Sequence, residues 1–237
     1  MDTDKNAKFH TGVMHPNNQT ILIKVLGQFD LIDGNPDETA RTWSLLSQIR
    51  PKIAPELYAH FQDSDKKCYF IMEKVEGTLL CDVVPSLNID ERWIVIGKLL
   101  ETIFLLHNNR FVHGCIFNEY ILVTKDQNII LLFFDNLELK ENRQEYNVDV
   151  DEVRNLIHYV ATNECPWFFE MTTQDVLDHK FDEYIRFTNG NVDLTSDDSL
   201  KVRSKYAEHG WNGERTNKLV KMCYKLTVHD MLEIYNS

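Results

Sequence analysis

The feature that most limits the fold is a change of hydrophobic period part-way along the chain. In the first third, apolar side chains gather in two short runs, 20–26 and 68–73, which are typical of buried strands. Across residues 90–107 they instead recur every three or four positions, the spacing of an amphipathic helix that faces a core. The sequence therefore predicts a strand-rich part followed by a helical part.

Local signals place the remaining elements. Asn35 and Pro36, followed by two acids, are typical of a helix start, and Pro51 limits the helix, which we expect to end at about Ile49. A turn is expected at 126–128. The other expected elements are strands at 111–116, 120–124 and 129–134, helices at 150–162, 173–187 and 214–235, and a polar loop at 189–199.

These elements indicate an α+β fold with two lobes. A length of 237 residues suits one compact domain or two closely packed lobes, with enough chain to bury a core. The boundary is expected near Gly77, which follows the second buried strand. Residues 1–77 then form a small mixed-sheet lobe with one helix, and residues 78–237 form a larger helical lobe with a small sheet inserted in it.

Charge, hydropathy and cysteine usage exclude several classes of function. The chain has 25 Lys and Arg residues against 37 Asp and Glu, a net charge of −12, which disfavours binding to a nucleic-acid backbone. No apolar run is long enough to span a membrane, and the first residues are too polar for a secretory signal. The five cysteines are scattered, without a C-x-x-C pair, which is typical of a reducing compartment. We therefore expect a cytoplasmic protein, a nuclear protein, or one found in both compartments.

The order of the motifs resembles the protein-kinase-like fold. A lysine on a strand, a helix, a strand ending at Glu-Gly and a long helix precede residues 111–123, FVHGCIFNEYILV, which resemble the kinase catalytic loop. Residues 129–137 resemble the strand that ends in the metal-binding Asp-Phe-Gly, which here reads Asp135-Asn136-Leu137. The resemblance implies a two-lobed fold, with the small sheet lobe above the larger helical one.

Smaller features resemble one branch of this superfamily. Residues 53–58 and 70–77 are similar to the approach to the interlobe hinge in small-molecule phosphotransferases and atypical kinases, and the His-Gly form of the loop is also theirs. Only about 14 residues separate Asp135 from Asp149, where conventional kinases carry a long activation segment. The chain is thus similar to the small atypical kinases that work with tRNA-modification complexes and to aminoglycoside phosphotransferases, over roughly residues 10–160.

For nucleotide binding, the resemblance implies three residues. Lys24 is in the place of the strand lysine that holds the α and β phosphates, and Asp135 is in the place of a metal ligand. The usual glutamate partner of the lysine falls on Thr42, with Glu38 one turn earlier. Residues 8–20, where the family has a glycine-rich phosphate loop, contain one glycine, Gly12.

The catalytic loop departs from the family pattern at three positions. The family's catalytic aspartate, two residues after His113, is replaced by Cys115, a weak hydrogen-bond acceptor when protonated. The asparagine that binds a second metal ion is replaced by Tyr120, and the lysine between them by Phe117. An alternative register would let Asn118 serve as the metal ligand, two positions early in the loop.

Two further roles remain open at the level of sequence. His113 is expected to brace the loop rather than to catalyse, with Asp149 or Asp151 in the analogous bracing role of the lower lobe. A nucleophilic Cys115 is the alternative to a small apolar filler, but adjacent residues of an extended strand point to opposite faces, so His113 would not reach it easily. The aromatic residues 167–169 fit either a plug under the helices or an anchor for a partner.

We therefore interpret the chain as a pseudokinase, a kinase-like protein without catalysis that acts as a scaffold or regulator of a protein partner. That partner would be an active kinase or an enzyme complex, and neither nucleic acid nor membrane is expected as a partner. The alternative is an enzyme, a divergent ATP-dependent phosphotransferase or ATPase that uses Lys24 and Asp135. The first interpretation requires neither ATP nor magnesium, although Lys24, Glu38 and Asp135 are the residues that would bind them.

Overall fold

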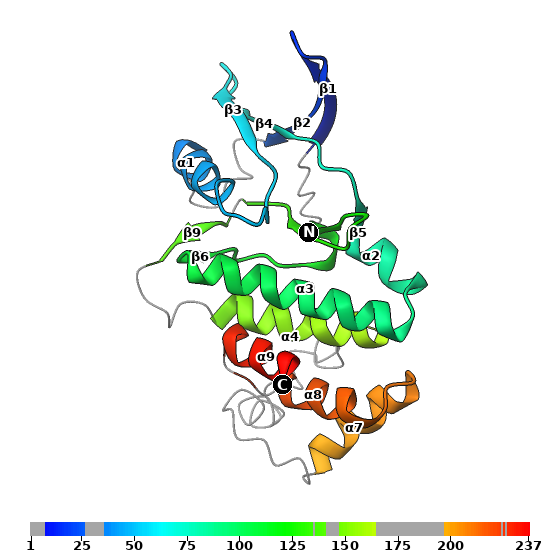
Figure 1. Ribbon diagram of the computed structural model, residues 1–237. Coiled ribbons are helices and arrows are strands. Elements are labelled where there is room, and N and C mark those ends of the chain that lie inside the picture. Colours follow the sequence, from blue (N-terminus) through cyan, green and yellow to red (C-terminus); the bar gives the residue numbers. More distant parts are fainter. Residues whose placement is uncertain are drawn as a thin grey trace.

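The computed structural model has two lobes, a small antiparallel sheet with one helix and a larger helical part (Figure 1). It describes residues 8–26, 36–134, 136–140, 147–164, 197–223, 225 and 227–237. This arrangement confirms the predicted α+β, two-lobed fold.

The sheet of the small lobe has four strands in the order β1-β2-β4-β3, all antiparallel. The strands are β1 (Lys8–Met14), β2 (Gln19–Leu26), β3 (Leu57–Gln62) and β4 (Cys68–Glu73). The two central strands, β2 and β4, are the two that the sequence predicted, because their side chains are apolar on both faces. Strands β1 and β3 were not predicted. They lie at the sheet edges, where most of their side chains are exposed and the hydrophobic pattern is weak.

The helix of the small lobe, α1 (Pro36–Leu46), covers one face of this sheet near β3. It ends at Leu46, somewhat before the expected Ile49. Its buried Trp43 packs against Phe70 of β4 and Phe134, with ring centroids 5.9 and 4.7 Å apart. The indole N–H also donates to the Pro55 carbonyl, at 3.0 Å. Trp43 thus joins the sheet lobe to the chain segment that precedes residue 135.

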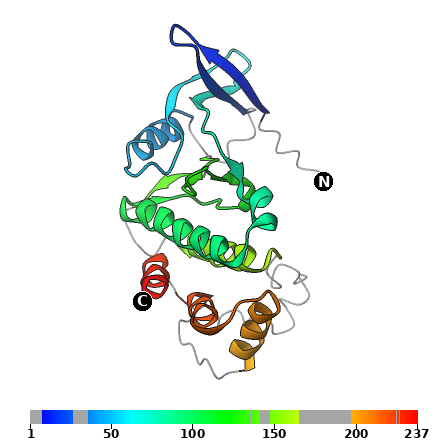
Figure 2. The ribbon, with the colours of Figure 1, turned by 45° about the vertical axis from the view of Figure 1, so that its right-hand side comes forward.

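The core of the large lobe is α3 (Ile89–Asn108), which extends one residue beyond the predicted helix at each end. Its start is a capping box: the Asn88 side chain accepts from the N–H groups of Asp90 and Glu91, and the Glu91 carboxylate accepts from the Asn88 N–H. The short α2 (Leu80–Val83) and a 3₁₀ turn, η1 (Val84–Ser86), lead into it. Helix α4 (Asn147–Thr162) packs along α3, as both views show (Figures 1 and 2).

Short strands lie between the sheet lobe and α3. Strands β5 (Thr78–Leu79), β7 (Ile121–Val123) and β8 (Ile129–Leu131) form one sheet, and β6 (Phe111–Val112) pairs with β9 (Glu138–Leu139). The predicted strands at 111–116 and 129–134 are therefore wrong in length. From residue 113 onward, backbone amides bond to carboxylates of α4 instead of to a neighbouring strand.

The C-terminal region contains α7 (Asp197–Glu208), α8 (Gly213–Cys223) and α9 (Val228–Asn236). The single helix predicted at 214–235 is wrong, because the Thr227 hydroxyl caps a new helix by accepting from the Asp230 N–H at 3.0 Å. Helix α7 begins inside the segment predicted as a loop, and the helix expected at 173–187 lies outside the described residues. None of the described helices has the length and apolar character needed to cross a bilayer.

Candidate functional site

The loop that follows β6 is held by a buried carboxylate on the first turn of α4. Asp149 has no exposed surface, and its two oxygens accept from three donors. Oδ2 accepts from the His113 N–H and from Nε2 of His107, both at 2.9 Å, and Oδ1 accepts from the Gly114 N–H at 2.8 Å. Of the two acids considered from the sequence, Asp149 is therefore the one that contacts the loop. Asp151 instead pairs with Arg154, at 2.5 Å.

A second carboxylate of α4 holds the next part of the loop. Glu152 lies three residues after Asp149, on the same helical face, and its Oε2 accepts from the Ile116 N–H at 2.6 Å. The pKa of Glu152 is raised to about 7: burial is the largest cause, the hydrogen bond from the Ile116 N–H opposes the rise, and the nearby carboxylates of Asp149 and Asp151 add to it. The sequence analysis did not select Glu152. The feature that could have identified it is an acidic residue three positions after Asp149, on the same face of the helix.

The loop is also tied to the strand that precedes residue 135. His113 is buried, and its Nε2–H donates to the Leu132 carbonyl at 3.0 Å. The Leu132 N–H in turn donates to the Tyr120 carbonyl at 2.8 Å. Gly114 has a positive φ of 72°, and a Cβ there would lie 3.1 Å from Asn136, so the position favours glycine. These contacts fix residues 113–120 against residues 132–136.

An aromatic stack fills the space between this loop and the sheet lobe. The Nζ of Lys24, on β2, lies 3.8 Å from the centroid of the Phe133 ring. Phe133 stacks on Tyr120, with centroids 4.2 Å apart and an interplanar angle of 9°. Phe117 meets Tyr120 edge-on, at 6.0 Å. The structure thus brings Lys24 and Tyr120, which are far apart in the sequence, into contact with the same ring, that of Phe133.

Phe133 adopts an unusual backbone conformation to reach this position. Its φ is +70°, the left-handed region, which costs a bulky residue roughly 1–3 kcal/mol. The cost is balanced by its surroundings, since the flanking Leu132 is fixed by two hydrogen bonds and Phe134 is buried beside Trp43. Sequence reasoning missed Phe133, because a positive φ at phenylalanine cannot be read from residue type.

The other residues predicted for nucleotide binding are dispersed. Glu38 is exposed on α1 and forms no ion pair with Lys24, although both residues are described. Thr42 is buried on the inner face of α1. Asp135 lies outside the described residues. Among the described residues, no group of three or more His, Cys, Asp or Glu side chains is arranged to hold a metal ion.

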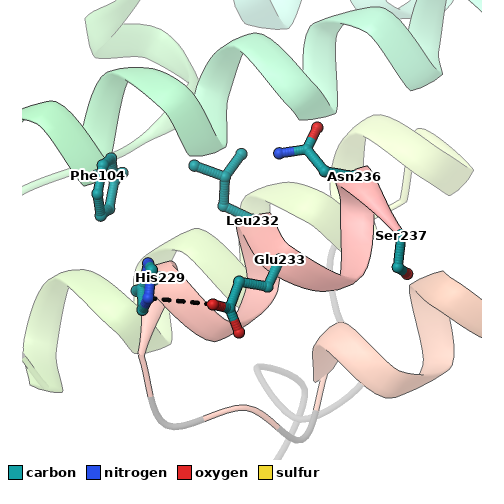
Figure 3. Close-up of a pocket in the computed structure, with 6 residues that line it drawn as sticks. All are labelled: Phe104, His229, Leu232, Glu233, Asn236 and Ser237. Carbon is teal, nitrogen blue, oxygen red and sulfur yellow. Dashed lines mark ion pairs between the residues drawn. The ribbon is translucent and has the colours of Figure 1, made fainter.

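A shallow pocket of about 440 Å³ lies elsewhere, between α3 and α9 (Figure 3). The His229 ring stacks on Phe104, with centroids 5.4 Å apart, and pairs with Glu233. The pocket is lined by Phe104, His229, Leu232, Glu233, Asn236 and Ser237. None of the residues that the sequence predicted for a site contributes to it.

Comparison with known proteins supports the two-lobed fold. No family model matches the chain. Over 116 residues, 47% of its length, the chain is 27% identical to the dual specificity protein kinase zakA of Dictyostelium discoideum, a match that spans 15% of that kinase. Among solved structures, a chain of the yeast RNA Pol II CTD kinase CTDK-1 complex superposes with a TM-score of 0.67 at 13% identity, over 98% of this chain and 90% of that one. The chain has a protein-kinase-like fold.

Lys24, the turn between β1 and β2, and Gly12 lie where the resemblance places nucleotide binding. The side chain of Lys24 is 1% exposed, and its ammonium faces the Phe133 ring. The turn between β1 and β2, residues 15–18, contains no glycine. Gly12 lies within β1, opposite Ile21 of β2.

The three altered positions of the kinase-like loop lie together. Cys115 is half-buried, Phe117 is 42% exposed, and Tyr120 lies in the stack with Phe133. Asn118, the alternative ligand, opens a 3₁₀ turn, η2 (Asn118–Tyr120). The loop thus carries a half-buried thiol and two aromatic rings that contact each other.

Proposed function

We propose that this kinase-like chain does not transfer phosphoryl groups and acts by binding a protein partner as a scaffold or regulator. The observation that carries the proposal is the enclosure of Lys24 against Phe133. A lysine with its charge on an aromatic face gains cation–π stabilisation, which a nucleotide would have to replace. A nucleotide that used Lys24 would therefore have to displace the Phe133 ring, and we expect this to disfavour its binding.

The chemistry of the loop supports the same proposal. General-base catalysis contributes typically 10²–10⁴-fold in rate, and a protonated thiol at Cys115 is a poor proton acceptor. A phenol at Tyr120 is a poor magnesium ligand, because magnesium favours carboxylate and phosphate oxygens. The chain thus lacks the family's catalytic base and one of its magnesium ligands, and its strand lysine is enclosed. We therefore expect no measurable phosphoryl transfer.

A protein partner fits the exposed part of the loop. Phe117 is 42% exposed, on a backbone that Asp149 and Glu152 hold in place. A rigidly held, exposed aromatic residue is a frequent anchor of protein interfaces. The yeast structural neighbour is itself described as part of a complex. We place this binding in the cytoplasm or the nucleus, in keeping with the cysteine usage.

An alternative function is a divergent phosphotransferase or ATPase that uses Lys24 and Asp135. The sequence likeness to a protein named as a dual specificity kinase favours it. It requires that Phe133 move away from Lys24 when a nucleotide binds.

A thermal-shift titration with ATP and magnesium separates the two functions. A ligand at 100 times its dissociation constant stabilises by about 2.7 kcal/mol, which for a chain of this size corresponds to about 5–10 °C in Tm. We expect no shift for the wild type at millimolar ATP. A metal-dependent shift of several degrees that Lys24→Ala abolishes would favour the enzyme.

A turnover assay with Asp135→Asn completes this test. Phosphate release or phosphoryl transfer by the wild type, lost in Asp135→Asn, would contradict the proposal directly. Phe133→Gly serves as an opened variant, since glycine accepts the positive φ and removes the ring from Lys24. ATP binding gained only in Phe133→Gly would identify Phe133 as the residue that excludes nucleotide.

The partner-binding part is tested by co-purification from the native source followed by mass spectrometry. Wild type, Phe117→Ser and Leu200→Ser are compared, because Leu200 of α7 is a similarly exposed apolar residue away from the loop. We expect Phe117→Ser to lose partners that Leu200→Ser retains. Equal recovery by all three proteins would show that the loop is not the binding surface.

A further inference from the structure

The sheet of the small lobe has one edge without the usual protection against strand pairing. Within the described residues, β1 pairs with β2 on one side and has no strand on the other. Its pairing runs without interruption from Lys8 opposite Val25 to Met14 opposite Gln19. The other edge strand, β3, contains a register shift between Leu57 and Ala59. Such irregularities discourage pairing with another chain, and β1 has none.

The composition of β1 also leaves this edge open. After Lys8, its first residue, β1 includes no further Lys and no Arg, Asp, Glu or Pro, the residues that commonly block an edge. The strand is seven residues long, longer than the average strand. Among its side chains, Phe9 is 48% exposed and Val13 is 55% exposed.

The two exposed apolar side chains lie on one face of the sheet. Phe9 is directly opposite Lys24, and Val13 is directly opposite Thr20, so both point to the face that carries Lys24. Helix α1 covers this face near β3, whereas β1 lies at the opposite edge (Figure 1). Phe9 and Val13 therefore lie on the same face as α1, at the edge of the sheet away from that helix.

A second copy of this chain fits that edge by register. If two β1 strands pair antiparallel about a two-fold axis at Thr11, Phe9 of each copy lies opposite Val13 of the other. Aromatic and β-branched residues form favourable cross-strand pairs, and symmetry supplies this pair twice. In the same register, position 8 of each copy is paired with position 14 of the other.

We propose that two copies of the chain associate through β1 in this register, joining two four-stranded sheets into one continuous sheet. The proposal is independent of nucleotide binding and of any other partner. Because each copy carries a net charge of −12, the copies repel at long range, and added salt should strengthen the dimer by screening that repulsion.

Sedimentation equilibrium over a range of concentrations measures the association. We expect reversible dimers with a dissociation constant on the order of 10–100 µM, as for a small interface. Val13→Lys or Phe9→Glu alone should weaken the dimer at least about tenfold, since each change places a charge opposite an apolar side chain twice. The double variant should restore association, because the introduced carboxylate of each copy then faces the introduced ammonium of the other.

The control is Phe61→Lys on the other edge strand, β3, where the side chain is 51% exposed. It should leave the dimer unchanged, and circular dichroism should show that all variants are folded. A wild type that stays monomeric at a concentration of about 1 mM would overturn the proposal. If Phe61→Lys were the one variant that weakened the dimer, the contact would lie at β3 and not at β1. If the double variant did not recover association, the proposed register would be refuted.

Discussion

Replacing Asp149 by asparagine should destabilise the protein far more than the same change at a neighbouring acid. The three hydrogen bonds to Asp149 lie at 2.8–2.9 Å and the carboxylate is fully buried. An asparagine has one acceptor oxygen, so in either orientation its NH₂ group faces at least one N–H donor from the loop or from His107.

The cost follows from these contacts. A hydrogen bond to a charged group contributes about 1.5–3 kcal/mol, and a buried donor left without an acceptor costs about 1–3 kcal/mol more. We therefore expect Asp149→Asn to lower the free energy of unfolding by roughly 3–5 kcal/mol, in the range measured for breaking buried polar pairs. That is a large fraction of the roughly 5–15 kcal/mol typical of a folded protein.

Urea unfolding followed by circular dichroism measures the loss. The matched control is Asp151→Asn, in the same turn of α4, where the carboxylate is partly exposed and pairs with Arg154. It should cost less than about 1 kcal/mol. Hydrogen exchange should also show that the amides of His113 and Gly114 lose protection only in Asp149→Asn. Equal costs for the two variants would refute the claim that Asp149 holds the loop.

Two further predictions concern α4 and α3. Because the pKa of Glu152 is raised to about 7 from 4.5, its protonated form is favoured in the folded state, so its contribution to stability is present at low pH and is lost as the pH rises from about 4.5 to 7. For the wild type we expect the free energy of unfolding to fall by about 1–2 kcal/mol between pH 5 and pH 8 from this group, after allowance for solvent screening. Urea titrations at the two pH values measure this difference, and Glu152→Gln should remove it. The same difference in the variant as in the wild type would contradict the prediction. Gly97→Ala should destabilise by about 1–3 kcal/mol despite the better helix propensity of alanine, because a Cβ there collides with the Tyr235 ring. In a Tyr235→Ala background the same change should become neutral or stabilising, and a cost that persists would place the collision elsewhere.

The elements that the sequence predicted best are those buried on their whole length or along one clear face. Strand β4 matches its apolar run at 68–73, and α3 matches its three-and-four spacing. Strands β1 and β3 carry mixed, exposed side chains because they lie at the edges of the sheet. The break before α9 depends on a single Thr227 cap, which periodicity does not detect.

The site was partly accessible to sequence reasoning. The motif order pointed to His113, Asp149 and Lys24. In the structure Asp149 accepts from the His113 N–H, His113 donates to the Leu132 carbonyl, and Lys24 lies against the neighbouring Phe133. The position of Phe133 could not be predicted from the sequence. Its backbone is in the left-handed region, and its ring lies against the Lys24 ammonium. Glu152 was missed because the pattern of the family drew attention to Asp149 alone.

The enclosure of Lys24 is tested most directly by the rate at which an amine-acylating reagent modifies it, measured by mass spectrometry. Lys74, which follows β4 and is exposed, is the internal reference. Since modification of Lys24 requires local opening, we expect it to react at least about a hundredfold more slowly than Lys74, and Phe133→Gly to remove most of the difference. Equal rates at the two lysines in the wild type, or protection of Lys24 that appears only when ATP and magnesium are added, would contradict the account.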